Sequence, residues 1–277
     1  MLKRLSAVVC VAGLVSGCMT VSVPEGQFFY PDARIKAENI VLTPGPAVPG
    51  GEVLSLPYSG GAVAATRVRT GRSDAPLILY CGGNLFRRGV NGAAVAGELA
   101  PFGDVLMFDY PGSGDTPGRA DFASYRAAGD SVAASARALA DAEGRRLIAW
   151  GHSLGGPVCA EAARAIRADA LVLEATTPTA RAAVDQMLGL WRPLVRVRMA
   201  DALAAVDVPA ALDGYPGRVV VLEAGRDRTL PPALSRILAQ ALERRGADVR
   251  RLVFPRADHG DIPDQPDFVA RVAAALG

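Results

Sequence analysis

The chain has 277 residues, half of them apolar, and a formal net charge of +2 with no long run of like charge. This length suits one large domain or two small ones with a sizeable core. The nearly balanced charge argues against a nucleic-acid-binding protein, which would carry a basic patch or stripe.

The N-terminus has the pattern of an export signal. A positively charged start is followed by an apolar run over residues 5–15, which is too short to span a bilayer as a mature helix. The small residues just before Cys18 resemble the lipobox of bacterial lipoproteins, in which the cysteine is lipidated and becomes the mature N-terminus. An ordinary secretory peptide is the alternative. We predict a lipoprotein signal peptide over residues 1–17 and lipidation of Cys18.

This resemblance implies an exported protein that is anchored in the bacterial cell envelope by its lipidated cysteine. Met19 follows the cysteine and, by resemblance to Gram-negative lipoproteins, favours the outer membrane. Residues 18–37 are expected to be an irregular tether before a domain over residues 38–277. Export permits a disulfide. However, Cys81 and Cys159 lie in apolar segments, and we expect two buried free thiols there.

Within the domain, the first strands are expected over residues 39–42 and 52–56, and an antiparallel strand over residues 63–69. Short apolar runs then alternate with alanine-rich stretches of helical length. The expected buried strands cover residues 77–81, 104–109, 146–150, 170–174, 218–223 and 249–254. The expected helices cover residues 91–100, 122–143, 157–168, 232–245 and 266–275. This order predicts an α/β fold, with a mostly parallel central sheet and helices on both faces.

One stretch between a strand and a helix carries the strongest chemical signal. Residues 151–155 read Gly-His-Ser-Leu-Gly and fit the pattern G-x-S-x-G, which places a serine on a sharp turn with its hydroxyl clear of the backbone. Gly151 and Gly155 are expected where a β-carbon would collide with the neighbouring element. The alternative is a glycine-rich turn that contains a serine by chance. The pattern predicts Ser153 as a nucleophile.

A serine hydroxyl needs a base and a group that orients the base. The chain has two histidines; His152 adjoins the serine and is expected to point elsewhere, which leaves His259 in the loop after the last strand. The acid should follow another strand, and Asp227 fits that position best. Asp213 and Asp207 are rivals in less regular sequence, and Glu174, which also ends a strand, is the second choice. Helix capping or a surface ion pair would be the structural reading of Asp227.

The order Ser, Asp, His agrees with that of α/β hydrolases. Over residues 60–277 the sequence resembles the α/β-hydrolase superfamily, within the serine-hydrolase group with little or no cap (the Bem46-like group). The likeness includes the Gly-x-Asp segment ending at Asp227 and the loop over residues 109–114, Asp-Tyr-Pro-Gly-Ser-Gly. That loop lacks the lysine and the helix signature of a phosphate site, so a nucleotide site is rejected. The resemblance also implies a short cap-like insertion, here over residues 176–217.

Acyl transfer needs two backbone N–H groups that hold the oxyanion. Leu154, directly after the serine, is expected to give one. The other should come from the loop after residue 81, where the family often reads His-Gly-Asn and this chain reads Gly-Gly-Asn. We choose Asn84, with Gly83 as the alternative.

These residues predict a serine hydrolase that cleaves a carboxylic ester or thioester of a small molecule or lipid. No cofactor and no metal are implied, because both histidines are accounted for. A peptidase with the same triad is one alternative, and a non-catalytic lipid-anchored envelope protein is another. Apolar residues of the insertion, such as Trp191, could line an acyl pocket or be buried core. The oligomeric state does not follow from the sequence.

Overall fold

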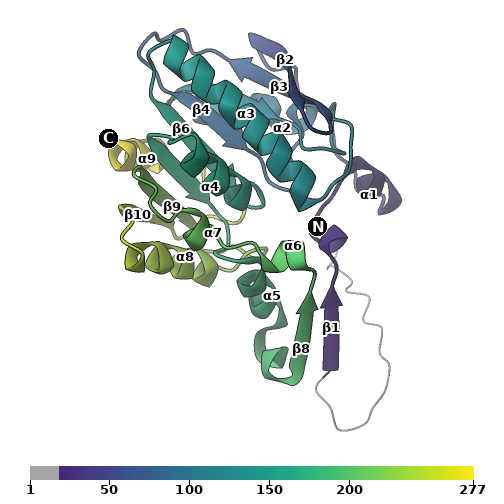
Figure 1. The fold of residues 1–277 in the computed structure, drawn as a ribbon. Coiled ribbons are helices and arrows are strands. Elements are labelled where there is room, and N and C mark those ends of the chain that lie inside the picture. Colours follow the sequence, from purple (N-terminus) through teal and green to yellow (C-terminus); the bar gives the residue numbers. More distant parts are fainter. Residues whose placement is uncertain (1–18) are drawn as a thin grey trace.

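The computed structural model describes residues 19–277, which form a twisted eight-stranded sheet between two layers of helices (Figure 1). The strand order is β10-β9-β7-β6-β4-β5-β3-β2. Strands β2 and β3 are antiparallel, β3 is antiparallel to β5, and all other neighbours are parallel. The α/β fold predicted from the alternating runs, with a mostly parallel sheet and helices on both faces, is confirmed, and the strand order fits the α/β-hydrolase fold that the resemblance implies.

The sheet strands are β2 (Gly51–Tyr58), β3 (Gly61–Val68), β4 (Leu77–Cys81), β5 (Asp104–Phe108), β6 (Leu147–His152), β7 (Ala170–Glu174), β9 (Arg218–Ala224) and β10 (Val249–Phe254). The helices that cover them are α2 (Arg88–Leu99), α3 (Phe122–Ala142), α4 (Gly155–Ala165), α8 (Pro232–Arg244) and α9 (Phe268–Leu276). Residues 39–42, which we expected to be a strand, are not one.

Apolar side chains on both faces of the central strands produce two cores. Every residue of β4, β5 and β7 is buried, as expected for parallel strands covered on both sides. One core lies between the sheet and α3, α4 and α8, and the other between the sheet and α2 and α9. This leaves the carboxyl ends of the strands as the edge where loops can carry functional side chains.

The prediction of an irregular tether is wrong for residues 19–37. They form strand β1 (Met19–Val23), a short 3-10 helix (Glu25–Gln27) and helix α1 (Asp32–Ala37). Phe29 is fully buried and packs edge-on against Phe122 and Tyr125 of α3. The N-terminal segment is therefore part of the folded domain. The predicted signal peptide and Cys18 lie outside the described residues.

The insertion between β7 and β9 folds into short elements: α5 (Ala180–Leu188), a 3-10 helix (Gly189–Leu194), β8 (Val195–Met199), α6 (Asp201–Ala204) and α7 (Val208–Ala211). Strand β8 pairs in parallel with β1, so that two segments far apart in the sequence meet in a two-stranded sheet that projects below the main body in Figure 1. Within residues 19–277, no helix is both long and apolar enough to cross a bilayer.

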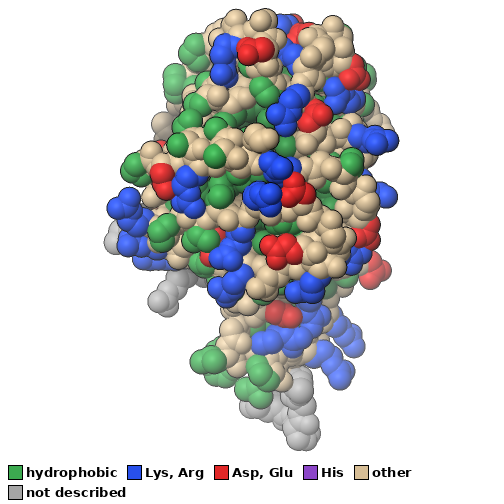
Figure 2. Space-filling view, turned by 90° about the vertical axis from the view of Figure 1, so that its left-hand side faces the viewer, with side chains coloured by type: hydrophobic (Ala, Val, Ile, Leu, Met, Phe, Trp, Pro, Cys, Tyr) green, Lys and Arg blue, Asp and Glu red, His purple; other side chains and the backbone are tan. Residues whose placement is uncertain are grey.

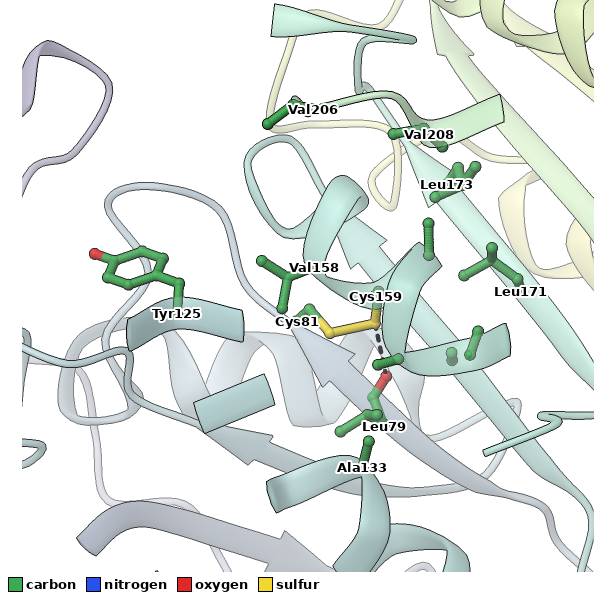
Figure 3. Close-up of a cluster of buried hydrophobic side chains, with 14 of the residues drawn as sticks. Leu79, Cys81, Tyr125, Ala133, Val158, Cys159, Leu171, Leu173, Val206 and Val208 are labelled. Carbon is green, nitrogen blue, oxygen red and sulfur yellow. Dashed lines mark hydrogen bonds between the residues drawn. A yellow bond between two sulfur atoms is a disulfide. The ribbon is translucent and has the colours of Figure 1, made fainter. Parts of the chain in front are cut away.

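The expectation of two free thiols is wrong, because Cys81 and Cys159 form a disulfide with their Cα atoms 5.8 Å apart. Cys81 ends β4, and Cys159 lies on α4, which runs back over the neighbouring strand β6 and over β4. Figure 3 shows the bond inside the buried cluster between the sheet and α3 and α4. The sequence showed that both cysteines are buried, but not that they face one another.

Candidate active site

The stretch around Ser153 forms a tight turn between β6 and α4. Ser153 has φ +53°, a left-handed conformation that is costly for a residue with a side chain. A β-carbon on Gly155 would lie 2.0 Å from the carbonyl oxygen of Cys81, and one on Gly151 would lie 2.7 Å from the carbonyl oxygen of Gly155. The predicted close approach at both glycines is confirmed, and it explains how the serine is pushed out of the turn.

The structure brings the three predicted triad side chains together at the carboxyl edge of the sheet. His259 Nε2 lies 2.9 Å from Ser153 Oγ, and His259 Nδ1 lies 2.7 Å from Asp227 Oδ2. With Nδ1–H donating to the carboxylate, Nε2 is free to accept the serine proton. The side chain of Asp227 is almost fully buried, and one fifth of the His259 side chain is exposed. The second-choice acid, Glu174, instead accepts a hydrogen bond from Trp150 Nε1.

Both oxygens of Asp227 are engaged. While Oδ2 faces the imidazole, Oδ1 accepts hydrogen bonds of 2.8 Å from the backbone N–H groups of Thr229 and Leu230. On the other side, Asp258 Oδ1 accepts a hydrogen bond from the His259 backbone N–H. These contacts hold the carboxylate and the imidazole in fixed orientations.

From the sequence we expected His152 to point away from the site, and this expectation is wrong. His152 Nε2 lies 3.1 Å from the carbonyl oxygen of His259, so Nε2 must carry the donated proton. Loss of hydration lowers the pKa of His152, which keeps the ring neutral. The ring therefore supports the loop that presents His259. Its position beside the serine in sequence was the available signal, but the contact depends on a residue 107 positions away.

The loop after β4 runs beside the serine. A β-carbon on Gly83 would lie 2.8 Å from His152 Nδ1 and 3.4 Å from Ser153 Cβ, which places Gly83 directly against the turn. The side chain of Asn84 points instead to the N-terminal segment, where it accepts from the Tyr30 N–H and donates to the Phe28 carbonyl. Within residues 19–277, no backbone carbonyl accepts a hydrogen bond from the N–H of Leu154, Gly83 or Asn84.

The loop over residues 109–114 has a structural role. The carboxylate of Asp109 accepts hydrogen bonds from the backbone and side chain of Arg88 and from the N–H of Asp115. It thereby fixes the start of α2, which follows the Gly83 loop.

In the part of the chain that the structure describes, no group of three or more His, Cys, Asp or Glu side chains could hold a metal ion.

A hollow of about 440 Å³ lies away from these residues. It is lined by residues 68–70 and 72, by Ala96 and Gly97 of α2 and by the segment that leads into β5, at the opposite edge of the sheet from Ser153. Ser153, Asp227 and His259 do not contribute to this hollow, so the candidate active site is located by their hydrogen bonds and not by the hollow.

Comparisons with known proteins agree with this architecture. The sequence profile described as the Alpha/beta hydrolase family matches residues 82–272. Two curated relatives, uncharacterised proteins from two strains of Mycobacterium tuberculosis, are 30% identical over 199 residues; the match covers 69% of this chain and 66% of each relative, just under two thirds of its length.

Solved structures of similar fold include three esterases. That of Pyrobaculum calidifontis is 18% identical with a TM-score of 0.60, covering 83% of this chain and 85% of the esterase. The esterase Pf2001 of Pyrococcus furiosus is 14% identical with a TM-score of 0.65, covering 85% and 95%. An esterase of Rhizomucor miehei is 17% identical with a TM-score of 0.60, covering 89% and 87%. Identities this low show the shared fold alone.

Proposed function

Because the chain belongs to the Alpha/beta hydrolase family, we propose that it is a serine hydrolase that cleaves a carboxylic ester or thioester through an acyl-enzyme. The observation that carries the proposal is the continuous hydrogen-bonded line from Ser153 Oγ through His259 to Asp227. A serine in a left-handed turn, a base within reach and a buried acid behind it are the parts that nucleophilic catalysis requires.

In the proposed reaction, Ser153 Oγ attacks the acyl carbon while its proton passes to His259 Nε2. The imidazolium that forms is stabilised by the Asp227 carboxyl group, which accepts the hydrogen bond from His259 Nδ1. The tetrahedral intermediate then collapses, and His259 gives the proton to the leaving alcohol or thiol. Water next attacks the acyl-enzyme, with His259 as the base, and releases the acid.

The negative charge of the intermediate needs donors beside the serine. The N–H of Leu154 is the first, because this residue directly follows the nucleophile. For the second, the position of Gly83 directly against Ser153 favours the N–H of this residue over that of Asn84. A backbone donor explains how the loop can serve without the histidine that the family often carries there.

An ester is favoured over an amide because the similar solved structures are esterases by their titles. A peptidase using the same residues stays the second reading. We further propose that Cys18 is lipidated and that the domain is held at the cell envelope, as the N-terminal pattern predicts; a non-catalytic lipid-anchored protein would share this anchor but not the reaction.

The test is labelling with a fluorophosphonate probe. We expect the wild-type chain to be labelled, and Ser153→Ala and His259→Ala to lose labelling. Asp227→Asn should retain the fold but lower ester turnover by on the order of 10³–10⁴. Ser135→Ala, a serine on α3 that only bonds the Ser131 carbonyl, is the matched control. A folded wild-type chain that is not labelled would refute catalysis and favour the non-catalytic reading.

A further inference from the structure

The middle of the insertion, over residues 187–194, carries an apolar surface that faces solvent. Four large side chains are exposed there: Met187 at 62%, Leu190 at 96%, Trp191 at 69% and Leu194 at 59%. We call these four residues the apolar tip. The sequence left two readings for such residues, the lining of an acyl pocket or buried core, and exposure this large shows that buried core is wrong for these four. A cluster of this kind marks an interaction surface, since single exposed apolar residues are ordinary but contiguous ones are not.

Basic side chains lie next to the apolar tip. From residue 187 to residue 199 the chain has three arginines and no acidic residue. Along β8, Val195 and Val197 are buried while Arg196 and Arg198 are exposed, so the two arginines share one outward face. Within residues 19–277, no acidic side chain forms a salt bridge with either of them. Figure 2 shows hydrophobic and basic side chains together on the projection at the bottom of the view.

The described chain begins at the same place. Strands β1 and β8 are parallel, and their register pairs Met19 with Val195, the residue directly after the apolar tip. Met19, the residue that follows the predicted lipidation site in the sequence, therefore lies at the tip end of the projection. A chain anchored at Cys18 brings the apolar tip to the membrane before any other described element.

We propose that the apolar tip and the exposed arginines of β8 form a docking surface for a lipid bilayer with anionic headgroups. Trp191 and the aliphatic side chains enter the interface, and the arginines meet the headgroups. An anchor alone leaves the domain free to rotate, whereas this second contact fixes its orientation. The insertion leaves the carboxyl end of β7, where the Glu174 carbonyl bonds the Ser153 N–H, so docking turns the Ser153 edge toward the bilayer.

The chain has two tryptophans, which makes the test specific: Trp191 is 69% exposed and Trp150 is fully buried. The full chain is placed in vesicles of phosphatidylcholine and phosphatidylglycerol with brominated acyl chains, which quench tryptophan at short range. We expect the emission of Trp191 to be quenched and shifted to the blue. Trp191→Phe isolates Trp150, whose emission should not change. A vesicle-bound wild type that shows no more quenching than Trp191→Phe would overturn the proposal.

A second measurement separates docking from anchoring. Residues 19–277 contain both cores and all the described helices and strands, so a chain that starts at Met19 keeps the folded body without the anchor. It should float with anionic vesicles. Arg196→Gln with Arg198→Gln should lower this partitioning by about fivefold per arginine, and Leu190→Ser should lower it on zwitterionic vesicles too.

Val53→Ser is the matched control, because Val53 is also exposed but lies on β2 at the far end of the molecule from β8 (Figure 1). Equal loss in this control would overturn the assignment of the apolar tip. So would a dimer that hides Trp191 without lipid, since the occupant would then be a second copy of the chain. Neither readout uses hydrolysis, so a failure of the proposed reaction would leave this test intact.

Discussion

The disulfide between Cys81 and Cys159 gives a prediction that the structure makes quantitative. Cys81 ends β4 directly before Gly82 and Gly83, and Cys159 lies one turn into the helix that begins after Ser153. The bond therefore ties the loop that carries the proposed oxyanion donor to the helix that follows the nucleophile. Replacing either cysteine by alanine removes this brace in the centre of a buried cluster.

The cost follows from the loop that the bond closes. The two cysteines are 78 residues apart in sequence. A loop of that length corresponds to about 4.5 kcal/mol of chain entropy removed from the unfolded state at 25 °C, and strain with residual unfolded structure brings typical measured losses to about 2–4 kcal/mol. We expect Cys81→Ala to lower the free energy of unfolding by an amount in this range, with hydrolysis lowered as the Gly83 loop loosens.

The assay is urea unfolding of both single variants and of the double variant, with and without a reductant. Either single variant already breaks the cross-link, so the double variant should lose little more, and a reductant should lower the stability of the wild type alone. Additive losses from the two single variants, or two reactive thiols at positions 81 and 159 in the oxidised, denatured wild type, would refute the disulfide.

Three further predictions concern the surroundings of the site. His152→Leu removes the hydrogen bond to the His259 carbonyl and should lower kcat about tenfold at unchanged KM; an unchanged kcat would show that the contact does not hold the base. Gly83→Ala places a β-carbon 2.8 Å from His152 Nδ1 and should lower kcat by about 10²–10³. The unfolding midpoint of the variant is the control, and it should not change, because only the local loop shifts. Burial, with Glu174 nearby, raises the pKa of Glu98 to about 7. The contribution of this carboxyl to the free energy of unfolding is therefore fully present below about pH 4.5 and is lost as the pH rises through 7. We expect this loss to be about 1–2 kcal/mol, because the carboxyl is partly exposed. Glu98→Gln should abolish it, and an equally large loss in the variant would assign it to another group.

The parts of the site that could be predicted from sequence are those set by strand topology. Carboxyl ends of parallel strands meet at one edge, so a serine after one strand, an acid after another and a histidine after the last can be brought together without knowledge of the loops. The structure places Ser153, Asp227 and His259 within hydrogen-bonding distance at that edge. The role of His152 could not be predicted in this way, because it depends on the path of a distant loop.

The parts that were missed depend on pairings between distant segments. Within residues 19–277, strand β1 pairs with no strand other than β8, about 175 positions away, and neither is stable alone. The alternating Val-Arg-Val-Arg of β8 was a visible strand signal within the insertion. The disulfide likewise requires the register of β4 against β6 and the seat of α4 over both, which no local pattern around Cys81 or Cys159 reveals.

The N-terminal segment joins the projection that carries the apolar tip to the edge of the sheet that carries Ser153. It begins beside the apolar tip as β1, then runs to the loop after β4, where Asn84 bonds Phe28 and Tyr30 and Arg87 bonds Asp32. The Asp32 carboxylate in turn accepts a hydrogen bond from the Gly114 N–H in the loop that begins at Asp109. Because this one segment contacts the projection and both loops at the strand ends, an orientation imposed at the proposed anchor would be transmitted to the edge that carries Ser153. A flexible tether would isolate the two, whereas the ordered path of residues 19–37 couples the orientation of the projection to the edge that carries Ser153.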